Sequence, residues 1–289
     1  MKLDVYSQVT DRVLEMMEQH GSNWVNPFAR KGKSALPVNI ASKKHYRGVN
    51  TLLLSWSGFV SPVWGTYKQW NERDCQVRKG EKSTTIVFWQ FIEKEEAGKV
   101  QRIPFLKYYN VFNADQVDGY QAEVIEEPTV AERIAGAEDF FRKIPAQITF
   151  SDAGRAYYSP ARDSVHVPAL DVFEDTPTST AAECYYSTIS HELVHWTGHK
   201  SRLNREQANA FGSEDYAREE LIAELGAAFL CANLGISSEP RIDHAHYLNG
   251  WIKKLGDHKR EFVSAASAAT KAVDLLIAMS EPEQVAQAA

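Results

Sequence analysis

Cysteine is scarce in this chain of 289 residues, which contains only Cys75, Cys184 and Cys231. The three are far apart, odd in number and form no CxxC pair, which argues against a disulfide framework and favours a reducing, cytosolic compartment. The first residues have no apolar run after Lys2, so no secretory signal is predicted. No apolar stretch approaches about 18 residues, so we expect no membrane-spanning segment and no membrane partner.

An excess of positive charge is also absent, because the net charge is −6 and the pI is near 5.9. This excludes a polybasic protein that coats DNA along its whole surface. The charge is uneven, however. Residues 1–125 carry 17 Lys and Arg against 13 Asp and Glu, whereas the remainder carries 15 against 25. With the length, this asymmetry predicts two domains, residues 1–125 and 126–289, joined by an acidic linker at residues 121–128 that ends in Pro.

The first domain is predicted to be α+β. We expect helices at residues 3–20 and from 46 to 54, because apolar residues recur there at helical spacing. A hairpin is expected over residues 77–92, with its turn at residues 78–82, and a further strand at 105–112.

The second domain is predicted to be mostly helical with a small sheet. Thr129 and Glu132 resemble a capping box that opens a helix to about residue 143. Pro168 suggests that the last of the predicted strands is an edge strand. The expected strands are 147–150, 156–158 and 163–168, and the helices that follow are 178–198, 215–233, 242–255 and 259–279.

The sequence His191-Glu192-Leu193-Val194-His195 is an HExxH motif. Two His at positions i and i+4 project from one face of a helix, so both imidazoles can reach one cation. Glu192 lies about a quarter-turn further round and is predicted to act as a general base that takes a proton from water. The alternative is a helix with two surface histidines, but the apolar Leu193 and Val194 favour a packed helix.

A catalytic metal site of this kind needs a third protein ligand. Position 201, where the extended motif HExxHxxGxxH has its third His, is Ser, and Gly198 is expected to end the helix before His199. A carboxylate from the next helix is therefore predicted. Glu220 and Glu224 lie one helical turn apart among apolar neighbours, and acidic groups in a packed face need a partner.

This arrangement resembles the gluzincin metallopeptidases, whose second helix carries E-x-x-A-(D/E). The resemblance implies that Glu220 binds the metal and that Glu224 accepts a hydrogen bond from a ligand His. The reverse assignment remains an alternative, as do surface salt bridges with Arg218 or Arg241. In these enzymes an edge strand holds the peptide substrate, and residues 165–168 have the right chain order for that role.

The first domain mixes basic and aromatic residues. Aromatic rings that stack on bases, among cations that follow phosphates, are typical of proteins that bind single-stranded nucleic acid. The alternative is that the rings are core and the lysines solvated surface. The candidate DNA contacts are Lys43, Lys44, Tyr46, Arg47, Trp64, Lys68, Trp70, Arg78, Lys79 and Lys82.

Several blocks of the chain resemble the ArdC-type antirestriction proteins. Residues 39–50 match the pattern N-x-x-(T/S)-x-x-x-Y-x-G-x-N. The other matching blocks are residues 64–70, 77–84, 109–113, 191–199, 202–205 and 219–225. They occur in the same order as in the family and extend over nearly the whole chain.

This resemblance implies a first domain that binds single-stranded DNA, also present in TraC-type plasmid primases, and a zincin-like metallopeptidase domain. It further implies a protein of conjugative plasmids and other mobile elements that acts in the bacterial cytoplasm and protects incoming DNA from restriction enzymes. Zn²⁺ is the expected cofactor, with Mn²⁺ or Co²⁺ as alternatives because a His2Glu site accepts several ions. The protein target would be a restriction or other DNA-processing enzyme.

Two other functions remain open from the sequence. In the first, the metal is structural and the protein protects DNA by covering it, without proteolysis. In the second, the chain is a cytosolic metallopeptidase that does not act on DNA.

Overall fold

The computed structural model describes residues 36–96, 99–122, 128–150, 154–176, 179–205, 213–236 and 259–281. The helices expected at residues 3–20 and 242–255 lie outside these ranges. The described residues divide into two compact units, an N-terminal unit within Leu36–Ile125 and a C-terminal unit within Glu126–Ala289.

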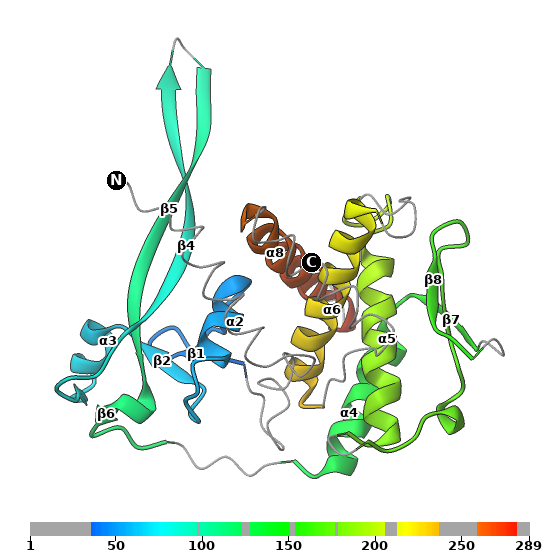
Figure 1. Ribbon diagram of the computed structural model, residues 1–289, viewed down its shortest axis with the longest axis horizontal. Coiled ribbons are helices and arrows are strands. Elements are labelled where there is room, and N and C mark those ends of the chain that lie inside the picture. The colour runs from blue at the N-terminus through cyan, green and yellow to red at the C-terminus, as the bar shows by residue number, and fades with distance from the viewer. Residues whose placement is uncertain are drawn as a thin grey trace, which may run out of the picture. The chain divides into compact units, whose positions relative to one another are not determined.

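The N-terminal unit is built on a four-stranded sheet of order β1-β2-β5-β4, in which only β1 and β2 are parallel. A two-stranded sheet, β3-β6, accompanies it. Strands β4 and β5 continue as a long twisted ribbon beyond the rest of the sheet (Figure 1). The elements are β1 (Val38–Asn39), α2 (Val49–Ser55), β2 (Val63–Gly65), α3 (Tyr67–Asn71), β3 (Gln76–Val77), β4 (Thr84–Glu96), β5 (Lys99–Asn113), η3 (Ala114–Gln116) and β6 (Val117–Asp118).

The predicted hairpin around residues 78–82 is wrong. Strand β3 is only two residues long and pairs with β6, whereas β4 pairs with β5 from Thr84↔Val111 to Glu96↔Lys99. The strand expected from Thr84 onward is present as β4, but its partner strand β5 follows it in the chain.

Trp64 and Trp70 are core residues, so their prediction as DNA-stacking rings is wrong. Trp64 is 1% exposed and Trp70 is 0% exposed. The indole N–H of Trp70 donates to the carbonyl of Phe112 at 3.1 Å. Gly65 permits this packing, because a Cβ there would lie 2.6 Å from the side chain of Ile40. Neither ring can stack on a base unless the unit unfolds.

Residues of the block at 39–50 hold the N-terminal unit together. The amide of Asn39 donates to the hydroxyl of Tyr46 at 2.9 Å. Asn50 exchanges two hydrogen bonds with the backbone of Val87 on β4, at 2.6 and 2.9 Å. These side chains therefore fix the fold, and Tyr46 serves it as a half-buried hydrogen-bond partner.

The C-terminal unit combines helices with a three-stranded sheet of order β7-β9-β8. Thr129 and Glu132 form the predicted capping box at the start of α4. Strand β9 has β7 on one side and β8 on the other, so its prediction as the edge strand is wrong. The elements are α4 (Val130–Lys143), β7 (Gln147–Phe150), β8 (Tyr157–Ser159), β9 (Ser164–Val167), η4 (Leu170–Val172), α5 (Ala181–Thr197), α6 (Glu214–Leu234) and α8 (Lys259–Ser280).

Helices α5 and α6 pack against each other along much of their length (Figure 1). Gly226 brings them close, because a Cβ at this position would lie 2.6 Å from a methyl group of Val194. The close approach places the acidic turns of α6 opposite the histidines of α5. Glycine in the interior of a helix lowers the stability of that helix. The close contact with Val194 explains why a glycine occupies this position.

Helix α8 packs against α6, α5 and α4. Its segment Glu261–Ser280 is long and apolar enough to cross a membrane by length and composition, so the expectation that no stretch of the chain has this property is wrong. Phe262, Ala266 and Leu276 are fully buried within the unit. A helix that packs against the core of a folded unit can have the same length and apolar composition as a membrane-spanning helix.

Candidate metal centre

The HExxH motif lies in the last two turns of α5. Thr180 and Glu183 form a capping box at the start of this helix, and Gly198 follows its end. His191 is buried and His195 is half-buried, and both face α6. The helix therefore presents both imidazoles to a neighbouring helix and not to solvent.

Three possible ligand atoms converge between α5 and α6. The Nε2 atoms of His191 and His195 lie 3.2 Å apart. The two carboxylate oxygens of Glu220 lie 3.5 Å from Nε2 of His191 and 3.6 Å from Nε2 of His195. For a tetrahedral site with metal–ligand bonds of about 2.0–2.1 Å, ligand atoms are about 3.3–3.4 Å apart. The spacing of the three side chains therefore fits one small divalent cation.

The opposite ring nitrogens face two other carboxylates of α6. Nδ1 of His191 lies 3.2 Å from Glu224, and Nδ1 of His195 lies 3.2 Å from Glu219. In a neutral imidazole, a proton on Nδ1 leaves Nε2 as an acceptor. When each Nδ1 donates to a carboxylate, the lone pairs of both Nε2 atoms and the carboxylate of Glu220 face the same point. Such a set of acceptors needs a cation between them.

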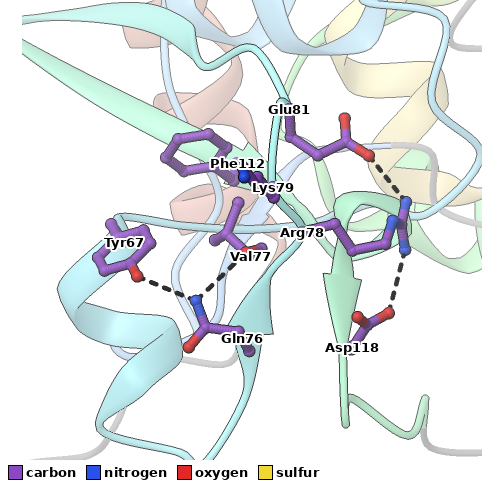
Figure 2. A pocket seen from close by; sticks show the side chains of 8 residues that line it. All are labelled: Tyr67, Gln76, Val77, Arg78, Lys79, Glu81, Phe112 and Asp118. Carbon is purple, nitrogen blue, oxygen red and sulfur yellow. Dashed lines mark hydrogen bonds and ion pairs between the residues drawn. The ribbon is translucent and has the colours of Figure 1, made fainter.

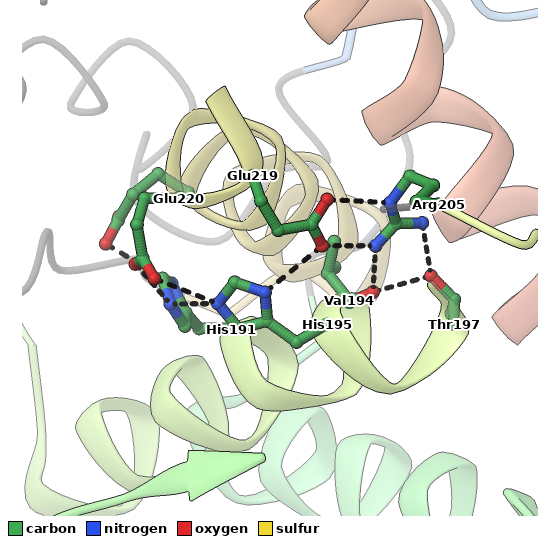
Figure 3. A network of polar contacts seen from close by, with 8 residues as sticks. His191, Val194, His195, Thr197, Arg205, Glu219 and Glu220 are labelled. Carbon is green, nitrogen blue, oxygen red and sulfur yellow. Dashed lines mark hydrogen bonds and ion pairs between the residues drawn. The ribbon is translucent and has the colours of Figure 1, made fainter. Parts of the chain in front are cut away.

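Arg205 holds Glu219 in this position (Figure 3). Its Nε donates to one oxygen of Glu219 at 3.0 Å and an Nη donates to the other at 2.8 Å. The same guanidinium donates to the carbonyl of Val194 and the hydroxyl of Thr197, at 2.6 and 2.9 Å. Arg205 therefore has two roles. It caps the end of α5, and it holds the carboxylate of Glu219 against His195.

Glu219 and Arg205 were not predicted as site residues. The available signals were the acidic pair Glu219-Glu220 and the block at residues 202–205 that follows the motif. The spacing of residues in the sequence cannot show that the loop containing Arg205 folds back to the end of α5. The hydrogen bonds of Arg205 show that it does.

The substitution Glu219→Gln is expected to weaken metal binding by about 10- to 100-fold, the usual cost of losing a carboxylate that orients a ligand His. Metal titration of the purified variant checks this. Arg202→Gln is the matched control. Arg202 also lies beside the end of α5, but it pairs with Asp163. An equal loss in both variants would mean that the helix end, and not the carboxylate on His195, controls affinity.

Both histidines have raised pKa values in the metal-free protein. Burial lowers the pKa of His191, but the charge of Glu224 and the hydrogen bond to Glu220 outweigh it and raise this pKa to about 9. For His195, burial is likewise outweighed by Glu219 and Glu220, which raise the pKa to about 10. His195 and Arg205 lower the pKa of Glu219 to about 2 despite its burial. At neutral pH the two imidazoles therefore carry protons where the metal would lie.

We expect metal binding near pH 7 to release about two protons, because the histidines must be neutral to act as ligands. The apparent affinity should rise by about 100-fold per pH unit from pH 6 to pH 8, below the pKa values of about 9 and 10, and level off above them. Calorimetric titration with Zn²⁺ in buffers of different ionisation enthalpy measures the proton count. Affinity that does not change over this pH range would contradict the geometry.

The structure brings together His191, His195 and Glu220 as predicted, with Glu224 on the second nitrogen of His191. Glu192 is buried on the same helix, about 100° round from His191. His199 stands apart from the cluster, with its Nδ1 2.8 Å from the hydroxyl of Ser201. A gluzincin-like ligand set is therefore possible without His199.

The other predicted DNA contacts lie on the surface of the N-terminal unit. The exposed cations among them are Lys43, Lys44, Arg47, Lys68, Arg78, Lys79 and Lys82. Among them, Lys68 lies 3.7 Å from Glu72, and Arg78 lies 3.0 Å from Glu81. Their role in DNA binding stays a prediction.

Two sequence families match this chain. Residues 3–112 match the N-terminal domain of anti-restriction factor ArdC, and residues 135–268 match a zincin-like metallopeptidase. The second match includes every residue of the cluster. Together with the cluster geometry, it supports a divalent-metal site.

The chain is similar to proteins from several sources. It is 37% identical to the uncharacterized protein y4eC of Sinorhizobium fredii over 97% of this chain and 94% of that protein. It is 36% identical to a DNA primase TraC of Escherichia coli, matching 98% of this chain but 28% of the primase.

Two crystal structures of the antirestriction protein ArdC from plasmid R388 have the same fold. The metal-free structure has a TM-score of 0.78 and 38% identity, covering 96% of this chain and 98% of ArdC. The Mn(II)-bound structure has a TM-score of 0.79 and 37% identity, covering 98% of this chain and all of ArdC. The two family matches, in this order, and the similarity along nearly the full length show that the chain belongs to the ArdC family of antirestriction proteins.

Proposed function

We propose that this protein protects DNA entering a bacterial cell from restriction, with a domain at residues 1–125 that binds single-stranded DNA and a metal-dependent peptidase-like domain at residues 126–289. The observation that carries the proposal is the cluster of His191, His195 and Glu220 in a chain that is similar to ArdC along nearly its full length. The bacterial cytoplasm is the proposed location, and single-stranded DNA and a restriction or other DNA-processing enzyme are the proposed partners.

The proposed metal ligands are His191, His195 and Glu220, with Glu224 and Glu219 orienting the two imidazoles. Zn²⁺ suits two imidazoles and one carboxylate, and Mn²⁺ or Co²⁺ are the alternatives. ArdC from R388 has a Mn(II)-bound structure. A divalent cation in this site supplies Lewis-acid activation of water and polarisation of a carbonyl.

In the proposed reaction, the protein's own groups manage the proton. Glu192 receives a proton from water as the peptide carbonyl is attacked, and passes it to the leaving amine. Its position next to His191 in the HExxH motif supports this role, and its side chain is buried. His191 and His195 remain neutral ligands, each donating from Nδ1 to a glutamate.

A second candidate function is protection by covering DNA, with no proteolysis. It is favoured by exposed aromatic side chains on the β4–β5 ribbon, which lie outside the metal cluster. These are Phe88, Tyr108 and Tyr109. In this case the metal would be structural. The metal-free and Mn(II)-bound structures of ArdC from R388 match this chain equally well. This argues against a metal that the fold requires, and so against a structural role for the metal.

The proposal is tested by conjugating an unmodified plasmid into a restricting host, with and without this protein. Recovery of transconjugants should increase when the protein is present, and should be unchanged in an isogenic host that lacks the restriction enzyme. Equal recovery with and without the protein in the restricting host would contradict the proposed function.

A further inference from the structure

We propose that an open pocket in the N-terminal unit binds one unpaired nucleobase of single-stranded DNA, an inference that rests on the proposed DNA binding of this domain. The pocket has a volume of about 490 Å³ and lies where α3, the β3 region and strands β5 and β6 meet (Figure 2). Pockets of about 300–1,000 Å³ are of the size that holds small organic ligands. A single base with its sugar fits within it.

Two aromatic rings from different elements form its apolar wall. Tyr67 begins α3, and Phe112 lies near the end of β5, with ring centroids 6.4 Å apart at an interplanar angle of 70°. Tyr67 is 47% exposed, whereas Phe112 is half-buried and packs against the core beneath. A ring fixed by its neighbours but open to solvent on one side is suited to stack on a base.

An amide group stands next to the exposed ring. Nε2 of Gln76 donates to the hydroxyl of Tyr67 at 2.9 Å, which fixes the orientation of both side chains. The carboxamide is exposed, and because Nε2 also donates to the carbonyl of Val77 at 3.3 Å, Oε1 is the atom left to accept from the edge of a base. An amide oxygen can accept a hydrogen bond from the exocyclic amino group of a base.

The charges of the pocket favour a neutral ligand. Arg78 lies 3.0 Å from Glu81 and 3.6 Å from Asp118, so its charge is balanced within the wall. With Lys79, the lining has two positive and two negative side chains and no net charge. A phosphate would meet repulsion from both carboxylates, whereas an uncharged base would not. Lys79 forms no hydrogen bond or ion pair with another described residue, so it can contact a phosphate beside the base.

The face of β5 that carries Phe112 continues away from the pocket. Alternate residues of a strand share a face, so Phe112, Asn110 and Tyr108 lie in one row, about 6.8 Å apart. Tyr108 is 63% exposed and Asn110 is exposed. The row gives the next nucleotides of an extended strand an amide and a second ring to contact. The pocket therefore lies at one end of an exposed row of side chains that a longer single strand could contact.

The experiment is fluorescence anisotropy of the full chain with a labelled 12-nucleotide single strand that carries the fluorescent base 2-aminopurine. We expect Tyr67→Ala to bind the strand about 5- to 150-fold more weakly, the effect of removing one stacking ring. Tyr67→Phe keeps the ring but loses the hydroxyl that holds Gln76, so it should bind more tightly than Tyr67→Ala and more weakly than the wild type. Phe150→Ala, which removes an exposed ring from the C-terminal unit, is the matched control and should bind within twofold of the wild type.

Lys79→Ala should weaken binding and reduce the slope of log K against log salt by about 1, as expected for the loss of one phosphate contact. The 2-aminopurine signal should change on binding to the wild type and to Tyr67→Phe, but not to Tyr67→Ala. Circular dichroism confirms that each variant is folded.

Failure of the pocket and failure of DNA binding give different results. If the wild type binds the strand but Tyr67→Ala binds equally well, the pocket is not a base site although the domain still binds DNA. Equal affinity of the wild type for a fully paired duplex would also overturn the pocket, because a paired base cannot enter it. If the wild type binds no DNA, the proposed function of the domain fails together with the inference.

Discussion

Replacing Glu192 by Gln is expected to reduce the proposed peptide hydrolysis by about 10²–10⁴-fold, the usual contribution of a general base. The amide keeps the size of the side chain but cannot take a proton, and Glu192 is not among the three clustered ligand groups. Metal affinity should therefore stay within about twofold of the wild type. A library of quenched fluorescent peptides measures hydrolysis, and calorimetric titration measures metal binding in the same preparation.

The same variant separates the two candidate functions. If protection depends on proteolysis, Glu192→Gln should fail to protect an incoming plasmid in the restricting host. Glu138→Gln, which changes an exposed carboxylate on α4, is the matched control and should protect fully. Full protection by Glu192→Gln would show that the protein acts by covering DNA, and the metal cluster would then need another role.

The substitution Glu220→Ala should weaken metal binding by more than the 10- to 100-fold that loss of an orienting group costs, because it removes a ligand itself. Bound metal stabilises the folded state by about 4 kcal/mol when its concentration is 1,000 times Kd. The wild type should therefore show a clear rise in Tm with added metal, and Glu220→Ala should show almost none. Thermal unfolding at several metal concentrations measures both values.

Two other variants on α6 serve as controls. Asp215→Ala removes an exposed carboxylate from the first turn of the helix and should leave the metal response unchanged. Glu224→Gln should give an intermediate loss, because Glu224 faces Nδ1 of His191 and not the point where the Nε2 atoms meet. A larger loss in Glu224→Gln than in Glu220→Ala would reverse the roles of the two glutamates.

The metal cluster could be predicted from the sequence because its spacing is local. His191 and His195 share a face of one helix, as do Glu220 and Glu224, and a helix fixes such relations within a turn. Arg205 and Glu219 were missed because their contact depends on a loop that returns to the end of α5. Hydrogen bonds across a fold leave no periodic pattern in the chain.

The sheets were predicted less well for the same reason. The strand propensity of residues 84–89 was clear, but a strand does not specify its partner, and β4 pairs with β5, which follows it in the chain. Pro168 follows β9 and does not interrupt it, so a central strand is compatible with this proline. Long-range pairing decides which strand lies at an edge.

Aromatic residues were the weakest basis for assigning function. Trp64 and Trp70 occur among basic residues in the sequence, but both are core residues of the N-terminal unit. The rings that line the open pocket, Tyr67 and Phe112, come from segments more than 40 residues apart and meet only in the fold. The amino-acid composition of the N-terminal unit indicates the class of ligand. The burial of each aromatic ring decides whether that ring can contact the ligand.

The most direct test of the metal site is anomalous diffraction from crystals of this protein grown with Zn²⁺ or Mn²⁺, recorded at the absorption edge of the metal. We predict one strong anomalous peak between α5 and α6, about 2.0–2.2 Å from Nε2 of His191, Nε2 of His195 and an oxygen of Glu220. A peak bound by Glu224 in place of Glu220, or no peak between the two helices in crystals that contain the metal elsewhere, would contradict it.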